Sequence, residues 1–358
     1  MKKIVLTGGG TAGHCTPNLA LIPYLKKKFD SIIYIGSKNG IEKNIVTKEE
    51  IPYFEISCAK VDRYKKSKNI LIPFKVIKGI VEAGKILDKE KPSVVFSKGG
   101  YVSIPTVIAA YNRKIPVISH ESDYTFGLAN KLIAKFSKVV LTSFPETATS
   151  INNAQYVGSP IRKFYTKEKT EILKEFGFTG NKPIILVTGG SQGSRAINDT
   201  LRESLPDLLQ RYDVLHICGK NNLSPDVNYK GYYQTEYLYN IENAFLISSV
   251  CVSRAGANTL FELMNMKIPC ILIPLPKGAS RGDQVLNAEY FQKKGLAQVL
   301  PQHALTKQSL LFNINSVYAN RLNIARNFSK NQISDQSEKI ANIIADFALW
   351  KYLYKILL

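Results

Sequence analysis

The chemistry encoded in this sequence centres on two glycine-rich turns that could bind phosphate groups. GGGTAGH spans residues 8–14 and GGSQGSR spans residues 189–195, and each follows a short apolar run typical of a buried strand. Glycines let the chain reverse sharply and open a helix, which leaves backbone N–H groups that can face an anion. The two turns therefore predict a nucleotide-diphosphate ligand and a second phosphorylated partner.

A third glycine pair, Gly99 and Gly100, follows the apolar run Val94–Phe96. Such a pair could cradle the diphosphate of a second substrate. The alternative is that these glycines only let a helix pack closely on a strand.

Gly8, Gly10 and Gly13 also match the G-x-G-x-x-G pattern of dinucleotide-binding folds. A nicotinamide site needs an acidic residue at the end of the second strand to hold the ribose hydroxyls. That strand ends at Ser37, and the nearest acid is Glu42, so the spacing argues against a dinucleotide oxidoreductase.

The segment Ser253–Phe291 carries groups that could bind a nucleotide. Residues 255–257 form a small-residue turn before a helix that Asn258 or Thr259 can cap. The positive end of that helix suits a leaving diphosphate. Glu262, one turn into the helix, can accept hydrogen bonds from ribose hydroxyls.

Two amide side chains follow in the same segment, Gln284 and Asn287. Because they are three residues apart on a helical pattern, both can face one sugar ring and offer donors and acceptors to its hydroxyls.

The elements that must position these groups are predicted to form parallel sheets. Continuous apolar runs alternate with helical patterns, at Ile4–Leu6, Ile32–Ile35, Val94–Phe96, Val117–Ile118, Val139–Leu141, Ile184–Val187, Val214–Ile217, Val250–Val252 and Ile271–Ile273. Such runs indicate strands that helices cover on both faces. The sequence predicts the α/β class twice, as two Rossmann-like domains facing each other across a cleft.

A length of 358 residues suits two domains, and a strand-like run ends in glycine and proline at Val157–Pro160. We expect domains of residues 1–161 and 162–335, with a hinge at 158–163. Residues 336–358 would pack back on the first domain, or would bring aromatic and apolar side chains to lipid, namely Trp350, Tyr352, Tyr354 and Leu358.

The formal net charge of +20 suits a phosphate-rich partner such as nucleic acid, an anionic membrane or a diphosphate substrate. Most of the excess positive charge comes from lysine, and a general lysine bias of the proteome would explain it equally well. Five scattered cysteines without a C-x-x-C pair favour a reducing cytoplasm. The N-terminal apolar run is too short for a signal peptide, and no segment is long enough to span a membrane.

An apolar patch rimmed by lysines lies within residues 65–85, KKSKNILIPFKVIKGIVEAGK. Such a patch is typical of a segment that lies on an anionic membrane surface. The alternative is a core helix whose lysines extend to solvent. The residues predicted to contact the membrane are Ile70, Leu71, Ile72, Phe74, Lys75 and Lys78.

Six segments follow one another along the chain in a specific order: GGGTAGHCTPNLAL, SKGGYVSIP, HESDYTFGLANK, VGSPIR, GGSQGSRAIN and Ser253–Phe291. In this combination they resemble the MurG family of peptidoglycan N-acetylglucosaminyltransferases, and the resemblance covers nearly the whole chain. It implies a GT-B glycosyltransferase, whose first domain would bind the acceptor and the membrane, and whose second domain would bind the donor.

The resemblance also implies the reaction. UDP-N-acetylglucosamine would be the donor and undecaprenyl-diphosphoryl-N-acetylmuramoyl-pentapeptide the acceptor, so that lipid I becomes lipid II. The muramoyl 4-hydroxyl would attack the anomeric carbon with inversion and expel UDP. The protein would lie peripherally on the cytoplasmic face of the bacterial cell membrane, with an anionic membrane surface but no nucleic acid as a partner.

The family pattern carries over residue by residue. It implies donor contacts from Thr11, Ala12, Gly13, Arg162, Ser191, Gln192, Ala257, Asn258, Thr259, Leu260, Glu262, Gln284 and Asn287. It implies contacts with the acceptor diphosphate from Gly9, Gly10, Thr11, His14, Gly99, Gly100 and Tyr101.

The candidate catalytic residues are His14, Asp123 and Glu262. His14 is best placed to take the acceptor proton, a role worth about 10²–10⁴ in rate, unless it caps the helix or contacts phosphate. The segment His120–Asp123 reads HESD where many relatives read HEQN. Asp123 could therefore be the base or orient His14, but it cannot donate the hydrogen bond of an asparagine.

The chain contains no D-x-D triplet, which metal-dependent nucleotide-sugar enzymes commonly use. We therefore expect no metal or cofactor, with a helix dipole, arginine and backbone amides stabilising the leaving UDP. Alternatives are another UDP-sugar GT-B glycosyltransferase, a UDP-sugar epimerase, or a basic nucleic-acid-binding protein that only the charge supports.

Overall fold

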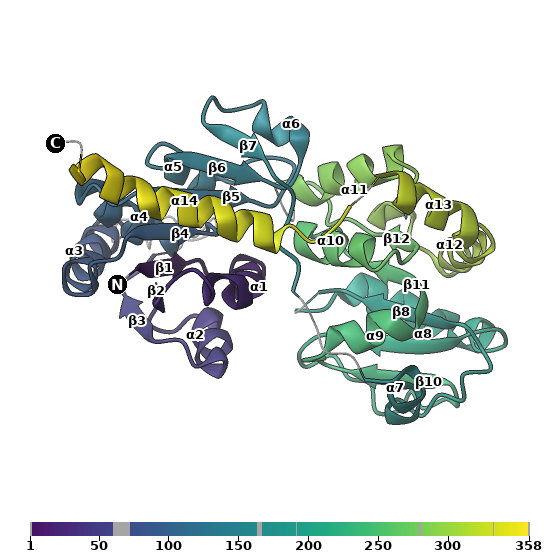
Figure 1. The fold of residues 1–358 in the computed structure, drawn as a ribbon. Helices are drawn as coiled ribbons and strands as arrows, with labels where there is room; N and C mark the ends of the chain where they lie inside the picture. The colour runs from purple at the N-terminus through teal and green to yellow at the C-terminus, as the bar shows by residue number, and fades with distance from the viewer. Residues whose placement is uncertain are drawn as a thin grey trace. The chain divides into compact units, whose positions relative to one another are not determined.

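Each half of the chain folds around its own parallel sheet, in a computed structural model that describes residues 2–59, 72–162, 167–190, 192–278, 281–331 and 333–356. Contacts divide the chain into a first unit, residues 1–162 with 335–358, and a second unit, residues 163–334 (Figure 1). The predicted α/β class with two parallel sheets is confirmed. Several predicted residues lie outside the described residues or the described side chains: Ala12 (side chain), Ile70, Leu71, Ser191, Trp350, Tyr352, Tyr354 and Leu358.

The first unit contains a seven-stranded parallel sheet in the order β3-β2-β1-β4-β5-β6-β7. Ile4 of β1 lies opposite Ile32 of β2 on one side and Val94 of β4 on the other. The strands are β1 (Lys3–Thr7), β2 (Ser31–Ser37), β3 (Tyr53–Ile56), β4 (Val94–Ser97), β5 (Val117–Glu121), β6 (Val139–Thr142) and β7 (Ala154–Tyr156).

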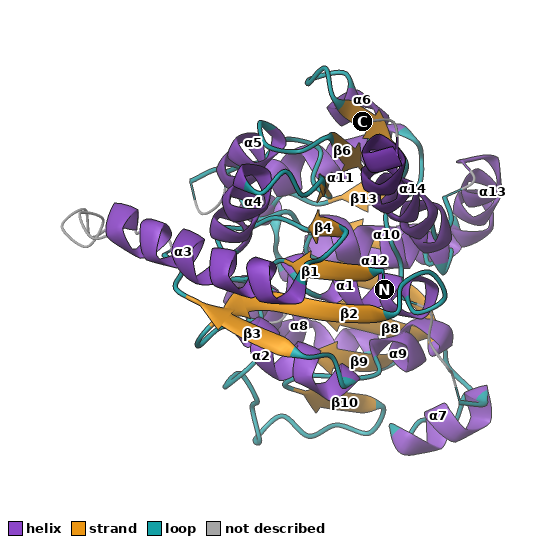
Figure 2. Cartoon of the chain, turned by 60° about the vertical axis from the view of Figure 1, so that its left-hand side comes forward, coloured by secondary structure: helices purple, strands orange, loops and turns teal. Residues whose placement is uncertain are grey.

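Helices cover both faces of this sheet, as the continuous apolar strands predict. They are η1 (Ala12–His14), α1 (Thr16–Leu25), α2 (Ile41–Val46), η2 (Thr47–Glu49), α3 (Ile72–Glu90), α4 (Ser103–Asn112), α5 (Leu128–Ala134), α6 (Pro145–Ala148) and α14 (Ser337–Ile356). Helices α1 and α14 pack on one core, and α3 and α4 pack together on the other (Figure 2). The C-terminal helix α14 thus belongs to the first unit, where Ile340 and Ile344 are fully buried.

The second unit repeats the arrangement with six parallel strands in the order β10-β9-β8-β11-β12-β13. The strands are β8 (Ile184–Thr188), β9 (Asp213–Ile217), β10 (Tyr232–Thr235), β11 (Ser248–Ser253), β12 (Cys270–Leu272) and β13 (Ala297–Val299). The helices are α7 (Lys169–Glu175), α8 (Arg195–Leu208), α9 (Ile241–Ile247), α10 (Ala257–Asn265), α11 (Asp283–Lys293), η4 (Gln302–Ala304), α12 (Lys307–Ala319) and α13 (Arg321–Asn331).

The strand order reverses direction at one point in each sheet, between β1 and β4 and between β8 and β11. Ligands of open α/β sheets bind outside the carboxyl ends of the strands at such a point. The three glycine turns and the Ala255–Ala257 turn all begin there, directly after β1, β4, β8 and β11. Among the described helices, none is both long enough and apolar enough to cross a bilayer.

Candidate active site

The two glycine turns of the first unit pack against each other. A Cβ atom on Gly100 would lie 2.4 Å from the carbonyl oxygen of Gly9 and 3.0 Å from Cδ2 of His14, so this approach requires glycine. A Cβ atom on Gly10 would lie 2.3 Å from Cε1 of Tyr101. The structure thus brings together residues predicted to bind the acceptor diphosphate, namely Gly9, Gly10, His14, Gly99, Gly100 and Tyr101.

The first turn has a carboxylate partner that the sequence did not reveal. Glu42 is fully buried, and its Oε2 accepts a hydrogen bond from the backbone N–H of Gly10 at 3.1 Å. Its Oε1 accepts from the backbone N–H of Ser37 at 3.0 Å and from Ser37 Oγ. The Gly10 N–H therefore faces a carboxylate of this chain, and its predicted contact with the acceptor diphosphate stays a prediction.

The loop that carries Asp123 is fixed from inside by Glu121, which is 2% exposed. Glu121 Oε1 accepts from the backbone N–H of Asp123 at 3.0 Å, and Oε2 accepts from Gly127 N–H at 3.1 Å and from Asn130 Nδ2 at 2.9 Å. Asn130 in turn lies against Gly99, where a Cβ atom would approach its Oδ1 within 2.0 Å. Glu121 therefore links the Asp123 backbone to Asn130, which packs on Gly99.

A buried lysine, Lys98, lies under this loop and is 1% exposed. Its Nζ lies 2.7 Å from Nδ1 of His120 and also donates to Ser122 Oγ. His120 Nε2 lies 2.9 Å from the carbonyl oxygen of Gly158. Because a carbonyl only accepts, Nε2 carries the proton and Nδ1 accepts from Lys98. Burial and then the Lys98 charge hold the pKa of His120 well below its usual range, so this imidazole is neutral.

Burial lowers the pKa of Lys98 to about 8, although the carboxylates of Glu121 and Asp123 oppose the shift. Lys98 therefore remains a cation at pH 7. Sequence reasoning did not select Lys98. The available signal was a lysine that ends a continuous apolar run directly before a glycine pair.

Asp335 joins the two segments where the chain leaves and re-enters the first unit. Its Oδ1 accepts from the backbone N–H groups of Ile161 at 3.0 Å and Ser337 at 2.9 Å. Arg162, predicted to lie near the nucleotide, pairs with Glu49 of the same unit at 2.9 Å. Its predicted nucleotide contact stays a prediction.

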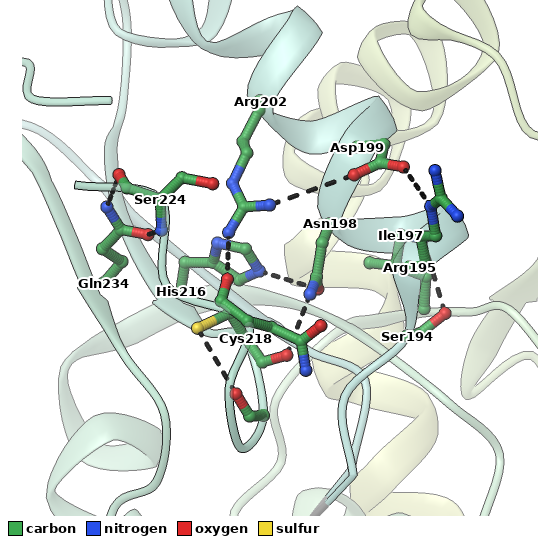
Figure 3. A network of polar contacts seen from close by, with 12 residues as sticks. Ser194, Arg195, Ile197, Asn198, Asp199, Arg202, His216, Cys218, Ser224 and Gln234 are labelled. Atoms are coloured by element: carbon green, nitrogen blue, oxygen red, sulfur yellow. Dashed lines mark hydrogen bonds and ion pairs between the residues drawn. The ribbon is translucent and has the colours of Figure 1, made fainter. Parts of the chain in front are cut away.

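The glycine turn of the second unit rests on a hydrogen-bond network around Asn198 (Figure 3). Asn198 Nδ2 donates to the carbonyl oxygen of Cys218 at 2.9 Å, and Asn198 Oδ1 lies 3.0 Å from His216 Nε2. His216 Nδ1 lies 2.8 Å from the hydroxyl of Tyr232. Burial lowers the pKa of His216 to about 3, so one neutral tautomer satisfies both bonds. A Cβ atom on Gly193 would lie 2.1 Å from the Cys218 oxygen, so the network fixes the surface on which the turn packs.

Arg254 connects three strand ends in the second unit. Its Nη2 donates to Ser194 Oγ after β8 at 2.6 Å, and its Nη1 donates to the carbonyl oxygen of Ile273 after β12 at 3.0 Å. Ser194 also caps α8 by accepting from Ile197 N–H at 3.4 Å. Burial lowers the pKa of Arg254. Nothing in its sequence context distinguishes Arg254 from the other arginines.

The turn before α10 is supported by both predicted amides. Gln284 Oε1 accepts from the backbone N–H groups of Ala255 at 3.3 Å and Leu275 at 3.0 Å. Asn287 Nδ2 donates to the carbonyl oxygen of Ala255 at 3.1 Å. Because Asn287 has no exposed surface, we assign it to support of this turn rather than to a direct sugar contact.

Helix α10 begins earlier than the sequence indicates. Gly256 is its N-cap and provides no side-chain hydrogen bond, so the expectation that Asn258 or Thr259 caps the helix is wrong. The half-buried Asn258, Thr259 and Glu262 lie on the helix itself, and Leu260 is buried. An N-terminus without a side-chain cap leaves backbone N–H groups that suit an anion.

An open pocket of about 750 Å³ lies elsewhere in the first unit, between the loop of residues 124–126, α5 and α6. Lys131, Lys135 and Glu146 are its charged lining residues. None of the predicted acceptor or catalytic residues lines it, so we place the candidate site at the glycine turns instead.

Family models match both halves of the chain. The N-terminal domain model of glycosyltransferase family 28 matches residues 4–142, and the C-terminal domain model of the same family matches residues 184–346. The chain is 47% identical over 352 residues to a Clostridium botulinum protein named UDP-N-acetylglucosamine--N-acetylmuramyl-(pentapeptide) pyrophosphoryl-undecaprenol N-acetylglucosamine transferase, covering 97% of this chain and 99% of that protein. A Clostridium tetani protein of the same name is 46% identical, covering 98% of this chain and 99% of its own length.

Solved structures share the fold. A crystal structure of Acinetobacter baumannii MurG matches 97% of this chain and 100% of its own, with a TM-score of 0.75 and 22% identity. The calicheamicin glycosyltransferase CalG4 matches 97% of this chain and 98% of its own, with a TM-score of 0.69 and 12% identity. At these identities the likeness supports the architecture alone.

Proposed function

Because this chain belongs to glycosyltransferase family 28, we propose that it transfers N-acetylglucosamine from UDP-N-acetylglucosamine to N-acetylmuramyl-(pentapeptide) pyrophosphoryl-undecaprenol. The observation that carries the proposal is the near-complete coverage, at almost half identity, of relatives that bear this activity in their name. The six quoted segments lie within this similarity, so both the donor half and the acceptor half of the reaction are represented.

In the proposed donor site, UDP-N-acetylglucosamine binds to the second unit. The N-terminus of α10 receives the diphosphate, because its N–H groups lack a side-chain cap. Glu262 accepts from the ribose hydroxyls, and Gln284 contacts the sugar while it holds the Ala255 turn. The remaining proposed donor contacts are Thr11, Ala12, Gly13, Arg162, Ser191, Gln192, Ala257, Asn258, Thr259 and Leu260.

In the proposed acceptor site, the lipid diphosphate binds where the two glycine turns of the first unit meet. Gly99 and Gly100 have φ angles of 92° and 81°, which point successive N–H groups in a way that suits an anion. Gly10 contributes its lack of a side chain rather than its N–H group, since Glu42 occupies that N–H. Thr11 and Tyr101 border the same turns.

The proposed reaction is a single inverting displacement. The muramoyl 4-hydroxyl oxygen attacks the anomeric carbon, the bond from that carbon to the diphosphate breaks, and UDP leaves. The hydroxyl proton passes to a base, either His14, which lies beside Gly100, or Asp123, whose backbone N–H is bound by Glu121. Backbone N–H groups at α10 stabilise the charge on the leaving diphosphate, and the proposal assigns no step to a metal.

We place the membrane contact on α3. Phe74, Ile77 and Val81 are 69%, 59% and 54% exposed and lie at helical spacing, whereas Gly79 and Ala83 are buried against the core. This distribution favours a membrane surface over the alternative of a core helix. Lys75 and Lys78 are exposed on the same helix, where they suit anionic headgroups. With a lipid-linked acceptor, we propose that the protein lies peripherally on the cytoplasmic face of the cell membrane.

The deciding experiment offers the purified protein labelled UDP-N-acetylglucosamine and a short-chain lipid-linked muramoyl-pentapeptide in excess EDTA. We expect sugar transfer under chelation, and we expect Glu262→Ala to reduce it by on the order of 10²-fold or more, because a ribose contact held in the transition state is lost. The matched control is Glu289→Ala, an exposed glutamate on α11, which retains activity.

Three outcomes would contradict the proposal. Absence of transfer with and without added divalent metal would remove the activity itself. Transfer only to a different acceptor would indicate another UDP-sugar glycosyltransferase. Conversion of the UDP-sugar without any acceptor would indicate an epimerase.

A further inference from the structure

The buried Lys98 has no part in the proposed reaction so far, although it lies under the loop that carries Asp123. It ends β4 and directly precedes the Gly99–Gly100 turn, and a Cβ atom on Gly8 would lie 3.2 Å from the Lys98 Cβ. Its backbone N–H donates to the carbonyl oxygen of Thr7 at 2.9 Å. Lys98 therefore lies between the two glycine turns and the Ser122–Asp123 segment.

Burying a lysine ammonium is energetically costly. Lys98 is buried together with groups that accept its hydrogen bonds and with negatively charged groups that stabilise its positive charge. Its Nζ donates to Nδ1 of His120 and to Ser122 Oγ. The negative charges of Glu121 and Asp123 both favour its cationic form. His120 is neutral, so it contributes an acceptor and no repulsion. Lys98 is thus a buried cation whose two negatively charged neighbours are the last residue of β5, Glu121, and Asp123, two residues later.

On the basis of the proposed function, we infer that Lys98 is a positioning residue with two roles. It fixes the Ser122–Asp123 turn. It also supplies the buried positive charge that keeps the Asp123 carboxylate ionised when the acceptor diphosphate is bound. The physical need is electrostatic. A bound lipid diphosphate brings several negative charges to the Gly8–His14 and Gly99–Gly100 turns, and negative charges nearby favour protonation of a carboxylate. A protonated Asp123 can neither accept the acceptor proton nor orient His14.

The neighbouring serine fits the same account. Ser122 accepts from Lys98, so the hydroxyl fixes the backbone position from which Asp123 projects. Glu121 fixes the other side of this turn through the Asp123 N–H. Lys98 does not touch substrate in this account, because its side chain is buried, and it acts only through the loop.

The test uses the full-length enzyme, with kcat and KM measured between pH 5 and 9. Lys98→Met removes the charge and the donors and leaves an unbranched side chain that is one atom shorter. We expect kcat at pH 7 to fall about 10-fold and the acidic limb of the kcat profile to move upward by about one pH unit or more, since a cation near a carboxyl typically lowers its pKa by about 1–3. The KM for UDP-N-acetylglucosamine changes less than about twofold, because neither Lys98 nor the Ser122–Asp123 turn is among the proposed donor contacts. Lys138→Met, an exposed lysine of the same unit, is the matched control and leaves the limb in place.

A double-mutant cycle separates positioning from general loss of structure. In an Asp123→Asn background, Lys98→Met should have little further effect on kcat, since the carboxylate on which it acts is already gone. Ser122 is half-buried, and Ser122→Ala keeps the charge of Lys98. This variant should therefore lower kcat without moving the acidic limb of the kcat profile. The result does not depend on whether the Lys98 variant is stable.

An unchanged acidic limb in Lys98→Met, additive effects of Lys98→Met and Asp123→Asn, or full kcat in Ser122→Ala would each overturn the inference. All three are read against a wild-type enzyme that transfers the sugar. If the wild type does not transfer at all, the proposed function fails instead, which distinguishes the two failures.

Discussion

At the scale of single residues, charged side chains from distant parts of the sequence contact the glycine turns or the segments beside them. Glu42 accepts a hydrogen bond from the Gly10 N–H, and Lys98 donates one to Ser122 in the segment after β5. In the second unit, Arg254 joins the ends of β8 and β12 by hydrogen bonds to Ser194 and Ile273. The glycines are evident from their spacing, whereas these hydrogen-bond partners lie up to 60 positions apart along the chain and become evident only from the contacts.

Glu42 gives a prediction at this scale. Glu42→Gln replaces one carboxylate oxygen by a donor that faces the N–H of Gly10 or the N–H and hydroxyl of Ser37. We expect the first unit to lose about 1–3 kcal/mol in free energy of unfolding, because a buried hydrogen bond to a charged group is lost. Urea unfolding followed by circular dichroism measures this loss.

Glu50→Gln is the matched control, since Glu50 is exposed and lies eight positions further along. Equal stability of the two variants would mean that the Glu42 carboxylate does not hold the turn.

At the scale of elements, inner strands were predictable and edge strands were not. The nine predicted strands are all present, because a strand covered on both faces leaves a continuous apolar run in the sequence. The strands that were missed, β3, β7, β10 and β13, are short and only partly buried. An edge strand needs fewer apolar residues, so its local pattern resembles a loop.

Helix α3 carries the prediction at this scale. Phe74→Ser with Ile77→Ser should remove most binding to vesicles that contain anionic lipid, because each apolar side chain entering the lipid contributes about 1.5–3 kcal/mol. Raising the salt concentration should weaken the wild type, since each nearby lysine contributes about 1 kcal/mol at an anionic surface. Vesicle co-sedimentation measures both effects.

Leu223→Ser is the control, an exposed leucine of the second unit at 47% exposure. Vesicle binding that survives in the α3 double variant would place the membrane contact on another surface.

At the scale of the whole molecule, each unit contains one buried neutral histidine, His120 in the first and His216 in the second. Both pKa values are lowered by burial, that of His216 from 6.5 to about 3. The unfolded chain therefore binds more protons than the folded chain between those two values. Stability that is present above about pH 6.5 is lost as the pH falls toward 3.

The resulting prediction concerns acid. The free energy of unfolding should fall by up to about 1.4 kcal/mol per pH unit for each histidine below pH 6.5. Urea titrations of the intact chain between pH 7 and 4.5 measure the slope. His216→Gln should flatten the slope of the second unit alone, and a slope identical to that of the wild type would show that His216 does not govern acid stability.

The sequence by itself determined the family resemblance, the two parallel sheets and the positions of the glycine turns, because each is encoded in consecutive residues as a strand run, a turn or a helix start. Only the tertiary structure decided which turn amides are occupied, that α10 begins at Ala257 without a side-chain cap, and that Lys98 is buried beside the Asp123 loop. The reason is physical: periodicity and turn chemistry are local, whereas a buried hydrogen bond or countercharge depends on residues that only folding brings within 3 Å or so.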